Sequence, residues 1–145
     1  MRMAKFITAL WLSVALASCA SPAERAAQAA AEGQAALDRG DVAGAREALA
    51  RAVQAYDGSA VLWVALARAH LRAEDYGGAF FAYSRASELD RANMEALQAL
   101  AELSLARGDV RGAVRYADVV GRRSLSIDVE RRERSAPFPG ATSSR

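Results

Sequence analysis

Apolar and polar residues divide the chain into a short apolar segment near its start and a long remainder of helical character. A basic start from Met1 to Lys5 precedes an almost unbroken apolar run from Phe6 to Leu16. This run is shorter than the roughly 18 to 20 apolar residues that cross a bilayer, so it predicts a secretory signal rather than a transmembrane helix. From Pro22 onward no alternating apolar pattern is present, and the chain is rich in Ala, Leu, Arg and Glu. The remainder is therefore predicted to be all-α.

A sequence motif recurs three times in this helical part. The form D-[VY]-x-G-A stands at residues 41–45, 75–79 and 109–113, so its copies lie 34 residues apart. The same spacing aligns further positions, namely Gly33, Ala67 and Ala101; Leu37, Leu71 and Leu105; and Gly40, Glu74 and Gly108. A fixed period of this length predicts repeated structural units, each too small to bury its apolar face alone.

The period and these residues resemble the tetratricopeptide repeat, a helix–turn–helix unit. The resemblance implies a right-handed superhelix of three repeats, 26–59, 60–93 and 94–127. The middle copy is nearest the family pattern, with Trp63, Leu66, Ala67 and His70 in its first helix and Ala79, Tyr83 and Ala86 in its second. The first copy lacks the aromatic residues, the third has Ala117 where the family has one, and the proline usual between repeats is absent. We therefore expect only the middle repeat to be fully packed.

The sequence predicts a defined helix start at one end of the helical part and a charged tail at the other. Ser21-Pro22-Ala23-Glu24 combines an S-x-x-E capping box with proline at the first helical position, so a helix should begin there. After Ile127 the core-forming residues stop, and residues 128–145 are predicted to be a charged tail, with a frayed turn or two followed by disorder.

The only cysteine lies where the apolar segment ends. Leu16-Ala17-Ser18-Cys19 resembles the lipobox of bacterial lipoproteins. The resemblance implies that residues 1–18 are a removed signal peptide, that Cys19 carries a covalent diacylglycerol and acyl lipid, and that residues 19–25 are the lipid-anchored start. Two or more acyl chains anchor a protein stably, whereas one does so marginally. Few Gly, Ser or Pro residues follow Cys19, so the first repeat should lie close to the bilayer.

Charge and residue chemistry argue against nucleic-acid binding and catalysis. The 19 basic groups of the chain fall to 17 without Arg2 and Lys5, which equals the 17 acidic groups, so no excess positive charge remains for nucleic acid. His70 is the only histidine and occupies a packing position, so a metal cluster or a histidine-based catalytic set is not expected. No phosphate-binding loop or nucleophile elbow is present. The sequence predicts a protein that is not an enzyme and has no cofactor besides the lipid.

Function is therefore expected from a binding surface. By the resemblance, the first helices line a concave groove that holds a protein or peptide segment, basic on the second repeat and acidic on the third. The groove positions are Gln34 and Leu37; Val64, Arg68, Leu71 and Arg72; and Glu95, Gln98, Glu102 and Leu105. The last repeat has no following helix, so its valines 110, 114 and 119 predict an exposed edge available for self-association.

These features favour a membrane-anchored interaction adaptor or assembly factor in the bacterial cell envelope. Ala20, rather than aspartate, follows the cysteine, which favours the outer membrane facing the periplasm by resemblance to other lipoproteins. The architecture resembles pilus-assembly and secretin-pilot lipoproteins. Two alternatives stay open, a soluble periplasmic chaperone-like module and an accessory subunit of a cell-wall enzyme. Lipid attachment separates the adaptor from the first, and co-purification separates it from the second.

Overall fold

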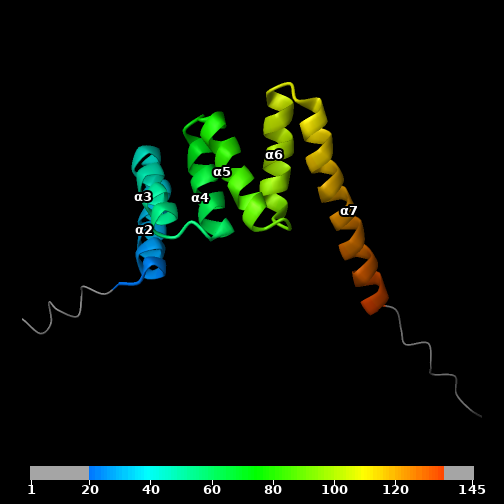
Figure 1. Ribbon diagram of the computed structural model, residues 1–145, viewed down its shortest axis with the longest axis horizontal. Coiled ribbons are helices and arrows are strands. Elements are labelled where there is room, and N and C mark those ends of the chain that lie inside the picture. Colours follow the sequence, from blue (N-terminus) through cyan, green and yellow to red (C-terminus); the bar gives the residue numbers. More distant parts are fainter. Residues whose placement is uncertain (1–19, 136–145) are drawn as a thin grey trace, which may run out of the picture. The chain divides into compact units, whose positions relative to one another are not determined.

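The computed structural model describes the backbone of residues 20–135 and the side chains of residues 20–122. Within these residues it contains helices and no strand, and the helices form three helix–turn–helix pairs (Figure 1). The pairs are α2 (Pro22–Asp38) with α3 (Val42–Ala55), α4 (Ala60–Arg72) with α5 (Tyr76–Leu89), and α6 (Met94–Ala106) with α7 (Val110–Ser135). The predicted all-α class and the three pairs are confirmed. The pairs belong to two compact units: the first ends at Arg91 and holds α2 to α5, and the second begins at Ala92 and holds α6 and α7.

Each pair contains the same turn, which explains the 34-residue motif. In the first pair the Gly40 amide donates to the Leu37 carbonyl at 3.0 Å, and the Asp41 amide donates to the Ala36 carbonyl at 2.9 Å. Such bonds end a helix through one residue with positive φ. Gly40 and Gly108 have φ values of 77° and 78°, and Glu74 takes the equivalent conformation at 57°. The middle repeat therefore places a side chain where its neighbours have glycine.

The aspartate of the motif begins the second helix of each pair. The carboxylates of Asp41, Asp75 and Asp109 accept the amide hydrogen of the glycine three residues later, at 2.9, 2.9 and 2.8 Å. These bonds satisfy an otherwise unpaired amide of the first turn. A Cβ atom on Gly44 would lie 2.2 Å from Asp41 Oδ2. The motif thus requires glycine because the capping carboxylate occupies the space of a side chain.

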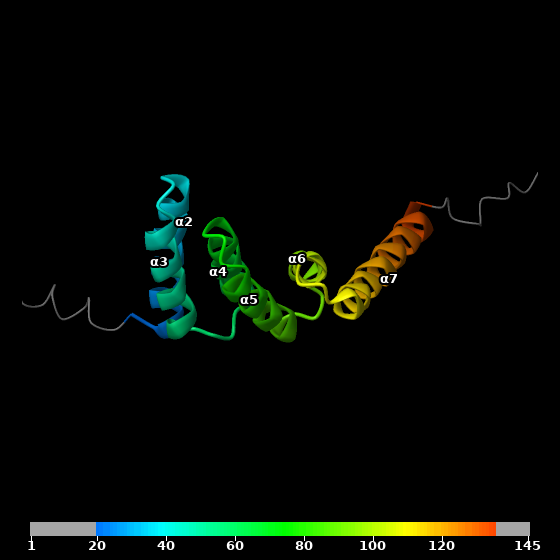
Figure 2. The ribbon, with the colours of Figure 1, turned by 90° about the horizontal axis from the view of Figure 1, so that it is seen from above.

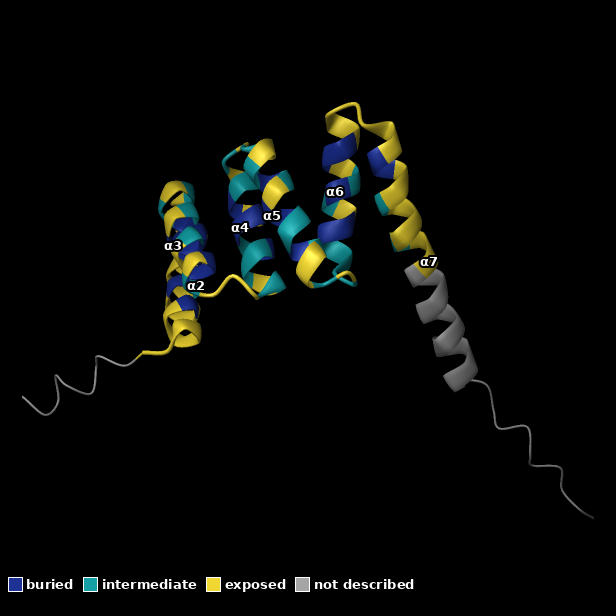
Figure 3. Ribbon diagram, in the orientation of Figure 1, coloured by how far each residue is buried: buried dark blue, intermediate teal, exposed yellow. Residues whose placement is uncertain are grey.

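Small residues allow the helices of the first unit to pack closely. Figures 1 and 2 show α2 beside α3 and α4 beside α5, and Figure 3 shows buried positions along these helices. The expectation that only the middle repeat is fully packed is wrong. Leu49 of the first repeat is 2% exposed and stands at the register position of Tyr83. A Cβ on Gly33 would come within 2.6 Å of Leu49 Cγ, so the leucine fills the space that the glycine leaves.

The second unit has a smaller core and a longer final helix. Leu97, Leu100 and Leu103 of α6 and Ala113 of α7 are buried, whereas Ala117 is exposed. Beyond Ile127, where the sequence predicts a frayed turn or two, α7 continues to Ser135. The Arg and Glu residues of this stretch are good helix formers, and no glycine or proline interrupts it. Residues 136–145, the rest of the predicted tail, lie outside the described residues.

The start of the first helix agrees with the sequence. Ser21 Oγ accepts the Glu24 amide at 3.2 Å, and Glu24 Oε2 accepts the Ser21 amide at 2.6 Å, so the capping box is formed with proline in the first helical turn. The predicted signal peptide and Cys19 lie outside the described residues. None of the described helices combines the length and apolar character that crossing a bilayer needs.

Candidate functional site

The first helices of the first unit present a partly polar face. Gln34 and Arg68 are exposed, and Leu71 is half-buried. Leu37 and Val64 are only 7% and 6% exposed. Their prediction as groove contacts requires correction, because α4 packs against α2 and α3 and these two side chains are covered within the unit. They stabilise the repeat pair instead of offering surface to a ligand.

Arg72 also takes a structural contact. Its Nη1 donates to the backbone carbonyl of Leu37 at 3.4 Å, a bond that joins the first helices of two successive repeats. A carbonyl oxygen has two lone pairs, so the Leu37 carbonyl can accept this bond as well as the one from the Gly40 amide, and a cation near the carboxyl end of a helix is favourable. Arg72 therefore helps to hold α4 beside the carboxyl end of α2.

The second unit contributes a separate face on α6. Gln98, Glu102 and Leu105 are exposed, with Leu105 at 58%, and Glu95 is half-buried. Their spacing of three and four residues places all four on one side of the helix. The predicted groove positions of the second and third repeats therefore lie on one face of α4 and on one face of α6. The expected order of charge along a continuous groove stays a prediction.

His70 belongs to a cleft between α3 and α4. Its Nδ1 lies 2.8 Å from Asp75 Oδ2, and its ring occupies the space that a Cβ on Gly78 would need. Because a carboxylate only accepts hydrogen bonds, Nδ1 is assigned as the protonated nitrogen. The Gly78 amide and then the His70 ring, both hydrogen-bonded to the Asp75 carboxylate, lower its pKa below the ordinary 3.8. This half-buried histidine thus has the packing role expected of its register position.

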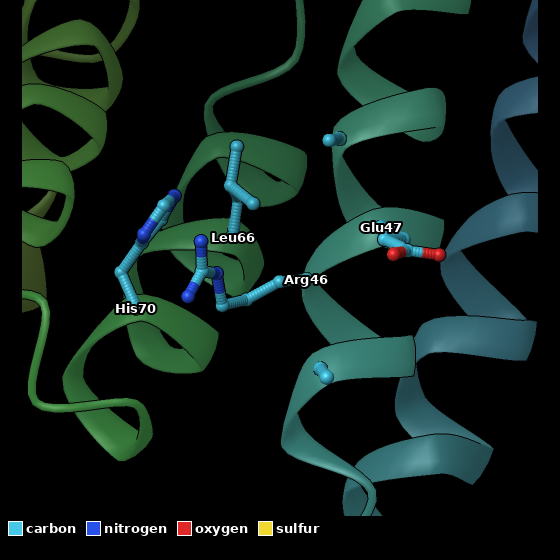
Figure 4. A pocket seen from close by; sticks show the side chains of 6 residues that line it. Arg46, Glu47, Leu66 and His70 are labelled. Carbon is cyan, nitrogen blue, oxygen red and sulfur yellow. The ribbon is translucent and has the colours of Figure 1, made fainter.

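The cleft has a volume of about 290 Å³ and is lined by Ala43, Arg46, Glu47, Ala50, Leu66 and His70. Figure 4 shows Arg46 reaching from α3 toward Leu66 and His70, while Glu47 points away from them. None of the lining side chains is a hydroxyl or thiol nucleophile. Among the residues that the structure describes, no three His, Cys, Asp or Glu side chains gather as a metal site would require. That the chain is not an enzyme stays a prediction.

An aromatic cluster lies at one end of the first unit, and sequence reasoning missed it. The rings of Trp63 and Phe81 meet edge to face with centroids 5.9 Å apart, and Arg85 Cζ lies 5.8 Å from the Trp63 ring centre. Trp63 Nε1 donates to the Asp57 carbonyl at 2.8 Å. Phe81 is 60% exposed. The adjacent Phe80 and Phe81 were the available signal, because successive helical residues point about 100° apart and cannot both face one core.

The valine edge of the last repeat is exposed as the sequence predicted. Val110 and Val114 are 60% and 61% exposed, and Val119 is exposed as well. Val110 and Val114 lie four residues apart and so share one side of α7. The exposure is confirmed, and self-association through it stays a prediction.

Comparison with solved structures identifies the fold. The chain is similar to the second tetratricopeptide domain of Spaghetti (RPAP3), which was solved bound to an HSP90 peptide, SRMEEVD. The TM-score is 0.62 at 22% sequence identity, over 67% of this chain and 90% of that one. No protein-family model matches the chain, and comparison with curated proteins found no match. With its three helix–turn–helix pairs, the chain has the fold of a tetratricopeptide solenoid.

Proposed function

We propose that this chain is a membrane-anchored adaptor that binds a segment of another protein on exposed faces of its first helices. The observation that carries the proposal is the shared fold with a tetratricopeptide domain that holds a peptide. Arg68 on α4, and Gln98, Glu102 and Leu105 on α6, are exposed at the register positions of the groove. Arg68 would orient an acidic group of the partner, and Leu71 and Leu105 would supply most of the affinity.

The anchor is the finer part of the proposal. Cys19 would carry the diacylglycerol and acyl lipid and hold the chain on the outer membrane facing the periplasm. The lipobox resemblance supports this, as does the capped helix that starts at Pro22 and leaves no room for a long tether. By its resemblance to pilot and pilus-assembly lipoproteins, the adaptor would serve the assembly of a pilus or secretion system.

Binding is tested by site-specific photocrosslinking in envelope extracts. A crosslinking residue at Arg68 or Gln98 should capture a partner, and one at Arg51, whose exposed side chain lies on the second helix of the first repeat, should not. Arg68→Glu should weaken capture in a salt-dependent way, Leu71→Ala should speed dissociation with little salt dependence, and Arg51→Glu is the matched charge control. Equal responses at Arg68 and Arg51 would show that the first-helix face is not the binding site.

The anchor is tested independently by mass spectrometry of the mature amino terminus. We expect a chain that starts at an acylated Cys19, and Cys19→Ala should release the protein from membranes or leave an uncleaved precursor. An unmodified terminus at another residue would favour the soluble chaperone-like alternative. A cell-wall enzyme that co-purifies with the chain and loses activity without it would favour the accessory-subunit alternative.

A second proposal concerns the exposed valines of α7, which would pair two copies of the chain. Sedimentation of the lipid-free protein should then show a concentration-dependent dimer, and Val114→Glu should abolish it because a charge would enter the apolar contact. A protein that is strictly monomeric at high concentration would refute the idea.

A further inference from the structure

Four helix termini share one end of the first unit. Because α2 to α5 alternate in direction, the start of α2, the end of α3, the start of α4 and the end of α5 lie together (Figure 1). The end of α2 that follows residue 20 is therefore the same end at which the loop between α3 and α4 turns. The turns that contain Gly40 and Glu74 lie at the opposite end.

Large apolar side chains are exposed at this shared end. Tyr56 follows α3, Val61 stands in the first turn of α4, and Leu89 is the last residue of α5; they are 47%, 74% and 41% exposed. We call these three residues the end patch. Large apolar side chains exposed at one end of a unit commonly mark a contact with an apolar partner.

The aromatic cluster of Trp63, Phe81 and Arg85 stabilises the backbone next to the end patch. The Trp63 indole donates to the Asp57 carbonyl and so fixes the loop between Tyr56 and Val61. Arg85, one turn before Leu89, packs over the Trp63 ring. Aromatic rings with a polar handle and arginines with apolar stems are typical of membrane interfaces, where one part meets hydrocarbon and the other meets headgroups.

The short connection to Cys19 indicates that the partner of the end patch is lipid. The helix cap Ser21 is two positions after Cys19, and an extended chain spans at most about 7 Å over that distance. A lipid on Cys19 would therefore hold this end of the unit within the headgroup region. Asp57 and Glu88 lie at the same end as Arg85, so the charges there are mixed and the apolar side chains would carry the contact.

We propose that the end patch is a membrane-contact surface that rests in the lipid interface and stands the first unit on its end. This inference rests on the proposed lipid anchor at Cys19. It assigns Tyr56, Val61 and Leu89 to lipid rather than to a protein partner, and it leaves the first-helix face accessible from the side.

The test uses spin labels on the full-length gene product, processed and lipidated in cells and reconstituted into phosphatidylethanolamine–phosphatidylglycerol vesicles. Cys19 would be blocked by its lipid, so a single cysteine introduced by Val61→Cys can be labelled selectively. Tyr76→Cys is the matched control, because Tyr76 is 56% exposed at the opposite end of the same unit. The 13 residues of α4 separate the two ends by about 20 Å.

We expect the label at residue 61 to collide more often with membrane-dissolved oxygen than with a water-soluble nickel reagent, and the label at residue 76 to show the reverse. Vesicle flotation measures the anchor separately. A protein that floats with the vesicles while the label at 61 stays in water, or becomes immobile without oxygen contact, would overturn the end-patch inference and leave the anchor standing. A protein that does not float would overturn the anchor and the inference together.

Discussion

The positive φ of Glu74 predicts that glycine at this position would stabilise the protein. Its φ of 57° falls in the left-handed region, where Gly40 and Gly108 stand in the other two repeats. A side chain in this conformation costs about 1–2 kcal/mol relative to glycine. Glycine also adds freedom to the unfolded chain, which removes about 0.4–1 kcal/mol of that gain. Glu74→Gly should therefore raise the free energy of unfolding by about 0.5–1 kcal/mol.

Urea unfolding monitored by circular dichroism measures this change. With a typical slope for a small domain, the midpoint should rise by about 0.3–0.5 M. The matched control is Glu47→Gly, the same change at an exposed position inside α3. There the φ is helical and the added freedom of glycine should destabilise the protein by about 0.5–1 kcal/mol.

The opposite signs of the two changes are the decisive result. Neither glutamate makes a hydrogen bond or ion pair in the described structure that the substitution would remove. A Glu74→Gly variant that loses as much stability as Glu47→Gly would show that the left-handed conformation of residue 74 carries no strain, and the argument would be wrong.

Three further predictions concern buried positions and the turn. Ala79 is fully buried, so Ala79→Leu should cost about 1–3 kcal/mol of stability, and Ala113→Leu should cost less because much of its helix is exposed; equal losses of melting temperature would contradict this. Ser104 is 1% exposed and its hydroxyl lacks a partner, so Ser104→Ala should stabilise the protein by about 1 kcal/mol in urea unfolding. The pKa of Asp75 is lowered in the folded state, so its charged carboxylate stabilises the fold above pH 3.8 and this contribution is lost as the pH falls through the folded pKa. Asp75→Asn, which retains a capping oxygen, should show a smaller loss of stability on acidification, measured as the unfolding midpoint against pH; an unchanged pH profile would exclude this role.

The sequence by itself determined the helices, their pairing and their turns, because these depend on contacts a few residues apart. The D-[VY]-x-G-A motif specifies its own local geometry: the aspartate caps the amide of a glycine three residues later. The capping box at Ser21 is local in the same way. A spacing of 34 residues then repeats one helix–turn–helix unit, so the tetratricopeptide fold could be predicted without any long-range information.

The exposure of individual side chains was decided only by the tertiary structure. Register placed Leu37, Val64 and Arg72 in a groove, but the first two are buried within the first unit and the third donates to a backbone carbonyl. Phe81 is exposed, and Arg85 lies over the Trp63 ring. Periodicity defines which side of a helix a residue lies on, whereas burial depends on the size and approach of the neighbouring helix. That is why the repeat could be predicted from the sequence, and the covered groove positions and the exposed end patch could not.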